Sequence, residues 1–253
     1  MEPIRLLVVD IDGCLVAVEH AAYDLGNLAR VAELNRSSLT DPAVPPLTIL
    51  SGRPHPYVDA LMQVLDIRVP AIFENGAGLA VRSPYTARYR AEVERGRVSL
   101  AVLARELGGR PELTIQPGKS ASLTVFPVDP DEGIEGIERL LEEIVEREAL
   151  ELVLDPAQEC VNVLVRGVDK GLGLRWLADE LALPLSQIAG IGDSLGDLAW
   201  LELCGFSCAP ANAVEAVQLR VDSVSEFEDV RAVEELYRAV IERNRRATSS
   251  LAE

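Results

Sequence analysis

The sequence has no long apolar segment, no paired cysteine motif and no excess of positive charge. No apolar run approaches the roughly 20 residues of a membrane-spanning helix, and the first residues lack the basic and apolar regions of an export signal. The four cysteines, Cys14, Cys160, Cys204 and Cys208, include no Cys-x-x-Cys pair. Reduced thiols are the simplest interpretation of that pattern. We therefore expect a cytoplasmic protein that does not contact a membrane.

The formal net charge of −17 limits the classes of partner. An acidic surface repels the phosphates of nucleic acids and anionic lipids, so we expect neither as a partner. The same field repels a small phosphorylated metabolite, so a site for one must carry its own cations. The 253 residues, of which 48% are hydrophobic and 26% charged, predict a globular chain with one large or two unequal domains. The oligomeric state is not encoded in these features.

The most informative stretch begins with four consecutive aliphatic residues, Leu6 to Val9, followed by Asp10, Asp12 and Gly13. An uninterrupted aliphatic run predicts a strand buried on both faces, as in a parallel sheet between helices. Ligands bind at the carboxyl ends of such strands, where these two acids would lie. Two converging carboxylates repel each other and favour a bound cation. Taken alone, Asp10 and Asp12 are equally compatible with an ordinary turn.

Other predicted strand ends carry polar residues. Ser51 and Gly52 follow the strand at 47–50 and lead into a helix, which predicts an anion-binding turn or a simple helix cap. Lys170 lies at a third such position, and Asp193 and Asp197 follow the strand at 187–191. Parallel topology brings strand ends from distant parts of the chain to one edge of the sheet. The acids suit Mg²⁺, while the hydroxyl and the amine can hold phosphoryl oxygens.

Strands and helices alternate on both sides of an insert with a different pattern. The insert contains a helical region rich in alternating arginine and glutamate, two strands, an acidic helix and two more strands. This order predicts a doubly wound, mostly parallel α/β core with a smaller inserted α+β domain. We expect the core to comprise residues 1–82 and 168–253, and the insert to comprise residues 83–167.

Together the motifs resemble those of the haloacid dehalogenase superfamily of Mg²⁺-dependent phosphatases. The resemblance covers nearly the whole chain and follows the family order: Asp10-Ile11-Asp12-Gly13, Ser51-Gly52-Arg53, Lys170-Gly171 and Gly192-Asp193-Ser194-Leu195-Gly196-Asp197. It implies a Rossmann-like core and a cap. The position of the cap, between the second and third motifs, is that of the subgroup containing Cof-like sugar phosphatases, sucrose-phosphate phosphatase, archaeal-type phosphoglycolate phosphatase and phosphomannomutase.

The resemblance also implies roles for individual residues. Asp10 is the expected nucleophile that forms an aspartyl-phosphate, and Asp12 is the expected general acid and base. Ser51, Gly52 and Lys170 are expected to bind the phosphoryl group. The expected Mg²⁺ ligands are the carboxylates of Asp10 and Asp193 and the backbone carbonyl of Asp12, with Asp197 supporting the ligand shell. The further candidates for substrate contacts are Arg53, Asn75, Lys119 and Asn212.

One departure from the family pattern is Gly196, where many relatives have asparagine. An amide that could support the substrate is therefore missing. The expected reaction is hydrolysis of a small phosphomonoester, either a sugar phosphate or phosphoglycolate. The alternatives are transfer of the phosphoryl group to a second acceptor, as in a phosphomutase, and a receiver-like phosphoacceptor without a substrate. A receiver needs no inserted cap, which counts against that alternative.

Two sequence patterns resemble nucleotide-binding motifs but fail in detail. Gly190-Ile-Gly192-Asp-Ser-Leu-Gly196 approximates a dinucleotide-binding fingerprint, but its third glycine is one position late. Asp193 would also direct negative charge at a pyrophosphate. Gly118-Lys119-Ser120 resembles the end of a P-loop, but Leu113 replaces the first glycine. We interpret this segment as a hairpin turn whose lysine either contacts a substrate anion or is merely solvated.

Overall fold

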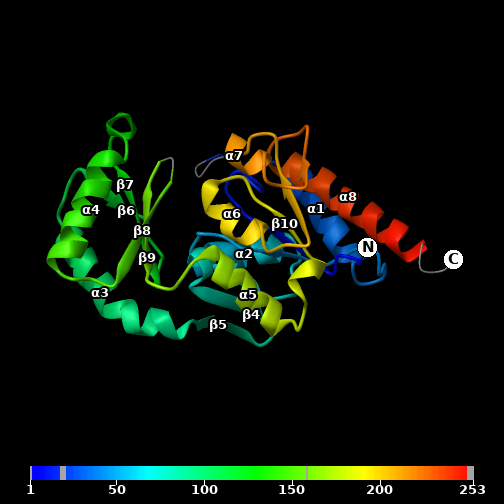
Figure 1. Ribbon diagram of the computed structural model, residues 1–253, viewed down its shortest axis with the longest axis horizontal. Helices are drawn as coiled ribbons and strands as arrows, with labels where there is room; N and C mark the ends of the chain where they lie inside the picture. The colour runs from blue at the N-terminus through cyan, green and yellow to red at the C-terminus, as the bar shows by residue number, and fades with distance from the viewer. Residues whose placement is uncertain (1, 18–20, 158, 250–253) are drawn as a thin grey trace.

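The computed structural model describes residues 2–17, 21–157 and 159–249, and it contains a larger α/β core beside a smaller α+β cap (Figure 1). Five parallel strands form the central core sheet in the order β12-β11-β10-β1-β2. Its strands are β1 (Leu6–Val9), β2 (Leu47–Ile49), β10 (Ile188–Ile191), β11 (Phe206–Ala209) and β12 (Ser223–Val224). Strand β1 lies between β10 and β2, with Val9 opposite Ile191 and Ile49. The acids that follow β1 therefore lie at the centre of the sheet edge.

The aliphatic run of β1 is buried on both faces because side chains of a strand alternate in direction. Leu7 and Val9 pack in one apolar cluster, and Leu6 and Val8 pack in another. The core helices cover these two faces: α1 (Leu25–Ser37), α2 (His55–Val64) and α8 (Asp229–Ser249) on the first, and α5 (Lys170–Glu180), α6 (Leu195–Leu201) and α7 (Glu215–Gln218) on the second. This arrangement confirms the predicted doubly wound fold.

A second, antiparallel sheet extends the core beyond β2. It consists of β3 (Ala71–Phe73), β4 (Gly78–Arg82) and β5 (Tyr85–Tyr89), and a parallel bridge between Leu50 and Ile72 joins β3 to the end of β2. The sequence predicted a helical region from about residue 83, and this prediction was wrong for residues 85–89, which form the strand β5. Five residues of β5 pair with β4, so tertiary pairing overrides the mixed charge of this segment. The division at residues 82 and 167 stays a prediction.

The cap is a four-stranded antiparallel sheet with two long helices on one face. The strand order is β6-β7-β9-β8, from β6 (Leu113–Ile115), β7 (Ser122–Pro127), β8 (Leu152–Pro156) and β9 (Val161–Val165). Helices α3 (Ala91–Leu107) and α4 (Glu135–Arg147) lie on the side of this sheet that faces away from the core (Figure 1). Leu103 of α3 and Leu141 of α4 pack with Val125 and Val163 of the sheet. The opposite face of the sheet is therefore turned toward the core.

Three short 3-10 helices complete the described structure: η1 (Glu74–Gly76), η2 (Pro130–Glu132) and η3 (Leu185–Gln187). Among the residues that the structure describes, no helix is both long and apolar enough to span a bilayer. The four cysteines are free thiols, and three of them are buried. Burial raises the pKa of Cys14, whose thiol also lies near the negative charges of Asp193 and Asp10. Cys14 is therefore not an activated nucleophile.

Candidate active site

Asp10 lies where β1 leaves the sheet, with only 5% of its surface exposed. Its backbone N–H donates to Ile191 O at 3.0 Å, which fixes the end of β1 against β10. One carboxylate oxygen accepts a hydrogen bond from Ile11 N at 2.7 Å, and the other accepts one from Lys170 Nζ at 2.6 Å. Both oxygens are therefore held at the mouth of the sheet.

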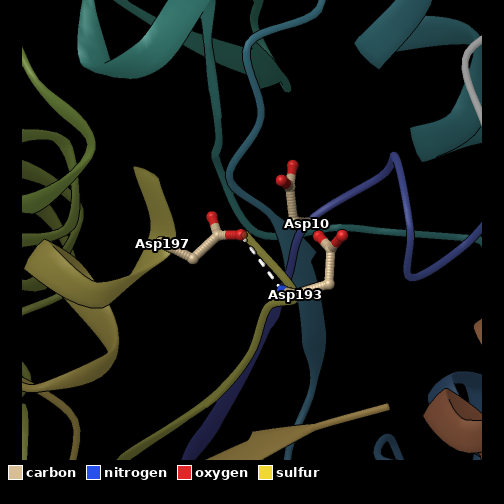
Figure 2. Close-up of side chains that lie close together, drawn as sticks. All are labelled: Asp10, Asp193 and Asp197. Carbon is tan, nitrogen blue, oxygen red and sulfur yellow. Dashed lines mark hydrogen bonds between the residues drawn. The ribbon is translucent and has the colours of Figure 1, made fainter. Parts of the chain in front are cut away.

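Asp193 follows β10 and approaches the loop after β1 very closely. Gly13 permits this approach: its φ of 73° favours glycine, and a Cβ built there would lie 2.1 Å from Asp193 Oδ2. Figure 2 shows the side chains of Asp10 and Asp193 close together, with that of Asp197 beside them. One ligand oxygen from each of these three acids lies within 4.8 Å of the others. All three offer carboxylate oxygens, which are ligands that Mg²⁺ prefers.

The electrostatics of this acidic cluster also fit a cation. Burial, together with the neighbouring carboxylates, raises the pKa of Asp10 from 3.8 to about 7 despite the opposing charge of Lys170. Burial and the charges of Asp197 and Asp10 raise the pKa of Asp193 to about 8. Such shifts mean that the negative charges are poorly compensated by protein groups alone. A divalent ion held by Asp10 and Asp193 would supply the missing positive charge.

Asp197 differs from the other two acids because protein donors already saturate its carboxylate. Lys170 Nζ and Trp200 Nε1 donate to Oδ1, at 2.7 and 2.8 Å. The backbone N–H groups of Asp193 and Ser194 and the Ser194 hydroxyl donate to Oδ2, at 3.1, 3.0 and 2.9 Å. Although burial opposes it, the charge of Lys170 lowers the pKa of Asp197. Asp197 therefore orients Asp193 and Lys170, in keeping with a supporting role.

Lys170 forms ion pairs with both Asp10 and Asp197. It lies on a helix, whereas the sequence predicted a strand end. It is the first residue of α5, because the Asp169 side chain caps that helix by accepting from Leu172 N at 2.7 Å. The expected strand end is wrong, since β9 already ends at Val165. Burial alone would lower the pKa of Lys170, but the carboxylates of Asp10 and Asp197 raise it above its usual range. The side chain is therefore a fixed cation beside Asp10.

The turn after β2 and the short helix η1 after β3 bring three small or polar residues close together: Ser51, Gly52 and Asn75. Ser51 is fully buried, and its hydroxyl accepts from Arg53 N at 3.3 Å, while Gly52 lines the cavity. Asn75 also lines the cavity; its backbone N–H donates to Ser51 O at 3.0 Å. The buried Asn75 Nδ2 has no hydrogen-bond partner in the described structure. A buried amide donor without a partner indicates a missing ligand or water.

The side chain of Asp12 is held by Arg53. Arg53 Nε donates to Asp12 Oδ2 at 2.8 Å, and its second nitrogen donates to Oδ1 at 2.6 Å. The guanidinium also lies over the Tyr57 ring, with its carbon 4.6 Å from the ring centre. A bidentate pair of this kind fixes both the position and the plane of the carboxylate.

Core and cap residues together line an open cavity of about 710 Å³, a volume typical of small-ligand sites. Its core side is lined by Asp10, Asp12, Asp193, Lys170, Gly52 and Arg53. Its cap side includes a row of polar residues from adjacent strands, because Thr124 of β7 pairs with Asn162 of β9, which pairs with Asp155 of β8. Lys119, on the turn before β7, hydrogen bonds to the hydroxyl of Thr124.

The polar row and one further acid, Glu74, are not among the site residues predicted from the sequence. Thr124, Asp155 and Asn162 alternate with apolar residues, but only the strand register shows that they face the core. Glu74 is fully buried and accepts hydrogen bonds from the cap turn around Ser120. Its position directly before Asn75, a candidate residue, was the available signal.

Asn212 occupies a different position from the other candidates. Its Nδ2 donates to Gly13 O at 2.8 Å, and its Oδ1 accepts from Asp229 N at 3.0 Å. Both ends of the amide are therefore used to hold the loop after β1 against the start of α8. Asn212 is not among the described residues that line the cavity.

Several known proteins resemble the chain in sequence or in fold. A family model for haloacid dehalogenase-like hydrolases matches residues 114–236. A phosphoglycolate phosphatase of Halorubrum lacusprofundi is 31% identical over 222 residues, covering 86% of this chain and 89% of that protein. The chain belongs to the haloacid dehalogenase-like hydrolases.

Other members of this hydrolase family align over almost the full chain. A phosphoglycolate phosphatase of Methanopyrus kandleri is 28% identical over 238 residues, covering 94% of this chain and 97% of that protein. The crystal structure of a haloacid dehalogenase-like hydrolase from Bacteroides thetaiotaomicron has a TM-score of 0.70 at 17% identity, covering 94% of this chain and 99% of that one. The predicted enzyme class, a phosphatase of the haloacid dehalogenase type, is therefore confirmed, and so is the predicted fold class.

Proposed function

We propose that the protein is a Mg²⁺-dependent phosphomonoester hydrolase that acts on a small phosphorylated metabolite through an aspartyl-phosphate on Asp10. The observation that carries the proposal is the position of Lys170 Nζ, 2.6 Å from Asp10 and 2.7 Å from Asp197, beside Asp193. A buried cation that touches the reacting carboxylate can neutralise phosphoryl oxygens as they approach it. The names of the phosphoglycolate phosphatase relatives support the same reaction.

In the first step, an oxygen of the Asp10 carboxylate attacks phosphorus as the bond to the ester oxygen breaks. The carboxyl group of Asp12 gives its proton to that oxygen, and the alcohol leaves. In the second step, water attacks phosphorus, Asp12 takes the proton, and the bond to Asp10 breaks to release inorganic phosphate. The two hydrogen bonds from Arg53 fix the orientation of the Asp12 carboxylate, and both residues line the cavity.

The phosphoryl oxygens would be held by donors that converge beside Asp10. Lys170 supplies a charge, and the turn at Ser51 and Gly52 supplies a hydroxyl and a backbone N–H. We assign a further contact to Asn75, which lines the same cavity and whose buried Nδ2 lacks a partner among the described residues. A phosphoryl oxygen would satisfy this amide, which is costly to leave unpaired.

Mg²⁺ would be bound by the carboxylates of Asp10 and Asp193 and by the backbone carbonyl of Asp12. When bound, the ion neutralises charge on the phosphoryl group during transfer. Asp197 supports this site through its hydrogen bonds to the Asp193 backbone and to Lys170. Its five protein donors suit a residue that orients the direct ligands.

The cavity and its polar cap side support a choice of substrate class. A volume of about 710 Å³ suits a small metabolite rather than a polymer. Lys119 can form an ion pair with a substrate carboxylate, while Thr124, Asp155 and Asn162 can form hydrogen bonds with substrate hydroxyl groups. We therefore propose phosphoglycolate or a sugar phosphate as substrate. Arg53 would border the leaving group beside Asp12, and Asn212 would support the site only through Gly13. A cytoplasmic location is also proposed, in keeping with four free thiols.

The test is hydrolysis of 2-phosphoglycolate, hexose phosphates, sucrose phosphate and p-nitrophenyl phosphate, with Mg²⁺ or with EDTA. The proposal predicts Mg²⁺-dependent release of inorganic phosphate from at least one small ester, and its loss in Asp10→Asn. Isomerised sugar phosphate without free phosphate would instead indicate a phosphomutase. Stoichiometric labelling without turnover would indicate a receiver-like phosphoacceptor.

A further inference from the structure

Glu74 and Asn75, two consecutive residues, connect the core side of the cavity to the cap. Both have left-handed backbone conformations, with φ of 49° and 55°, which is uncommon for residues other than glycine. Their N–H groups donate to Arg53 O and Ser51 O at 3.1 and 3.0 Å, so the turn is fixed to the segment after β2. The Asn75 side chain lines the cavity, whereas the Glu74 side chain contacts the cap.

The Glu74 carboxylate is fully buried and is satisfied by cap donors. Its Oε1 accepts from Ser120 N at 3.0 Å, and its Oε2 accepts from Ala121 N at 2.8 Å and from Ser122 Oγ at 2.9 Å. A buried carboxylate is stable only with such strong donors, and removing them is costly. Glu74 therefore fixes three successive cap residues to the core.

Lys119 directly precedes the residues that hydrogen bond to Glu74, and the residue before it makes a second contact with the core. Gly118, on its other side, lies against Pro54: a Cβ built on Gly118 would be 3.8 Å from two Pro54 carbons. Pro54 directly follows Arg53, which binds Asp12. The backbone of Lys119 thus lies between two contacts with the core, one to Glu74 and one to Pro54. Each of these two residues is next in sequence to a residue that lines the cavity, Asn75 or Arg53.

The composition singles out Lys119 as well. The chain has 24 lysines and arginines, of which only Lys119 and Lys170 are lysines, and both line the cavity. Arginine supplies every other permanent side-chain cation. A compact ammonium group can approach an oxyanion as a point charge, which the planar guanidinium does less well.

We propose that Glu74 is a positioning residue: it anchors the turn 118–120 so that Lys119 faces the cavity and binds the carboxylate of a phosphorylated hydroxy acid. This inference rests on the proposed function for its reaction. The anchoring itself is independent of that reaction and can be measured without substrate. Glu74 acts through Lys119, because its own carboxylate is occupied by cap donors.

The first test is amide hydrogen exchange of Ser120 and Ala121 in the full-length protein. Glu74→Gln keeps the size of the side chain but places an amide N–H₂ group against N–H donors. We expect exchange of these two amides to become about tenfold faster or more, since charge-assisted hydrogen bonds are lost. Lys119→Met should leave their exchange within about twofold of wild type. Unchanged exchange in Glu74→Gln would overturn the anchoring.

The second test compares 2-phosphoglycolate with 2-hydroxyethyl phosphate, which replaces the carboxylate by a hydroxymethyl group. Lys119→Met and Glu74→Gln should each raise KM for 2-phosphoglycolate about tenfold while changing kcat less than about twofold. Both variants should leave KM for 2-hydroxyethyl phosphate nearly unchanged. In the double variant, KM should rise no further, because Glu74 acts through Lys119.

Two further variants separate positioning from general damage to the fold. Ser122→Ala removes one donor to Glu74 and should cause a smaller change of the same kind, even if Glu74→Gln fails to fold. Asp222→Asn alters a carboxylate directly before the distant strand β12. This carboxylate also accepts a backbone N–H and a hydroxyl, both from Ser207 of β11. The substitution should leave both KM values unchanged.

The outcomes also distinguish this inference from the proposed function. The positioning role would be overturned if the KM increases of Glu74→Gln and Lys119→Met multiplied in the double variant. It would also be overturned if either variant raised KM equally for both substrates. If the wild type hydrolysed neither ester, the proposed function would fail, whereas the exchange experiment would still decide whether Glu74 anchors the turn.

Discussion

Arg53 binds both carboxylate oxygens of Asp12, with nitrogen to oxygen distances of 2.6 and 2.8 Å. The guanidinium is itself 7% exposed and stacked on Tyr57, so it is a rigid partner. Asp12 comes from the loop after β1 and Arg53 from the turn after β2. The pair therefore joins the two loops that carry the proposed nucleophile and the proposed phosphate-binding turn.

Arg53→Met should impair acid catalysis more than nucleophilic attack. Without the two hydrogen bonds, the Asp12 carboxyl group loses its fixed orientation toward the leaving oxygen. We expect kcat/KM for an alkyl phosphate to fall about 100-fold, and that for p-nitrophenyl phosphate, whose leaving group needs little protonation, to fall by less than about tenfold. Steady-state kinetics with both esters measure this difference. Arg53→Lys, which keeps the charge but not the planar fork, should resemble Arg53→Met; equal losses on both esters would contradict the account.

Asp12→Asn and Asp193→Asn should separate catalysis from metal binding. Asp12 is proposed to bind Mg²⁺ through its backbone carbonyl, so Asp12→Asn should keep the Mg²⁺ affinity within a few-fold while lowering kcat by about 10²–10⁴. Asp193→Asn removes a ligand and should weaken Mg²⁺ binding at least about tenfold. Isothermal titration calorimetry with MgCl₂ measures both affinities. Comparable losses of affinity in the two variants would show that the assignment of Asp12 is wrong.

Gly13→Ala should disrupt the proposed metal site by displacing the side chain of Asp193. The added Cβ would lie 2.1 Å from Asp193 Oδ2, and the φ of 73° disfavours alanine. We expect the free energy of unfolding to fall by about 2 kcal/mol or more and Mg²⁺ affinity to fall together with it.

Gly136→Ala in α4 is the matched control for that substitution. A Cβ at Gly136 meets no atom within 4 Å, and helix propensity favours alanine. Urea denaturation should show a gain of up to about 1 kcal/mol there. Equal stability losses in the two variants would mean that contact with Asp193 is not the cause.

The metal-free protein should lose stability as the pH rises. The folded-state pKa values of Asp10 and Asp193, about 7 and about 8, exceed the ordinary value of 3.8. Between pH 3.8 and about 8, the folded protein therefore binds more protons than the unfolded chain. Its free energy of unfolding falls as the pH rises through this range. In EDTA we expect Tm to drop on the order of 5 °C from pH 5 to pH 8.

Excess MgCl₂ should flatten this pH dependence, because the cation stabilises the ionised carboxylates. Thermal melts in EDTA and in MgCl₂ across the same pH range measure both effects. Metal-free melts whose Tm is constant or rises with pH would contradict the described electrostatics of Asp10 and Asp193.

The sequence was sufficient to predict which acids lie at the edge of the core sheet, because the predicted strands that precede these acids are short, largely apolar runs that end within two residues of an acid. Four aliphatic residues before Asp10 specify a strand buried on both faces, and parallel topology then brings Asp193 to the same edge. The position of Lys170 beside Asp10 was also predicted, although its element was not. A helix that starts at Lys170 depends on the cap formed by Asp169, a local hydrogen bond that hydrophobic periodicity does not reveal.

Features that depend on tertiary pairing could not be predicted in this way. The segment Tyr85–Tyr89 has mixed charge, and only its pairing with β4 makes it a strand. The row formed by Thr124, Asn162 and Asp155 requires the register of three strands that are distant in sequence. Glu74 looks like a surface acid in sequence, yet it is buried because the cap turn supplies its hydrogen-bond donors.

The most direct test of the account is to identify the residue that carries the phosphoryl group during turnover. The enzyme is mixed with Mg²⁺ and substrate, quenched in acid within the first turnovers, digested, and analysed by peptide mass spectrometry. The account predicts an acid-stable acyl phosphate on Asp10, absent from Asp10→Asn and from samples quenched after the substrate is consumed. Phosphoryl groups on another residue, or turnover that persists in Asp10→Asn, would contradict it.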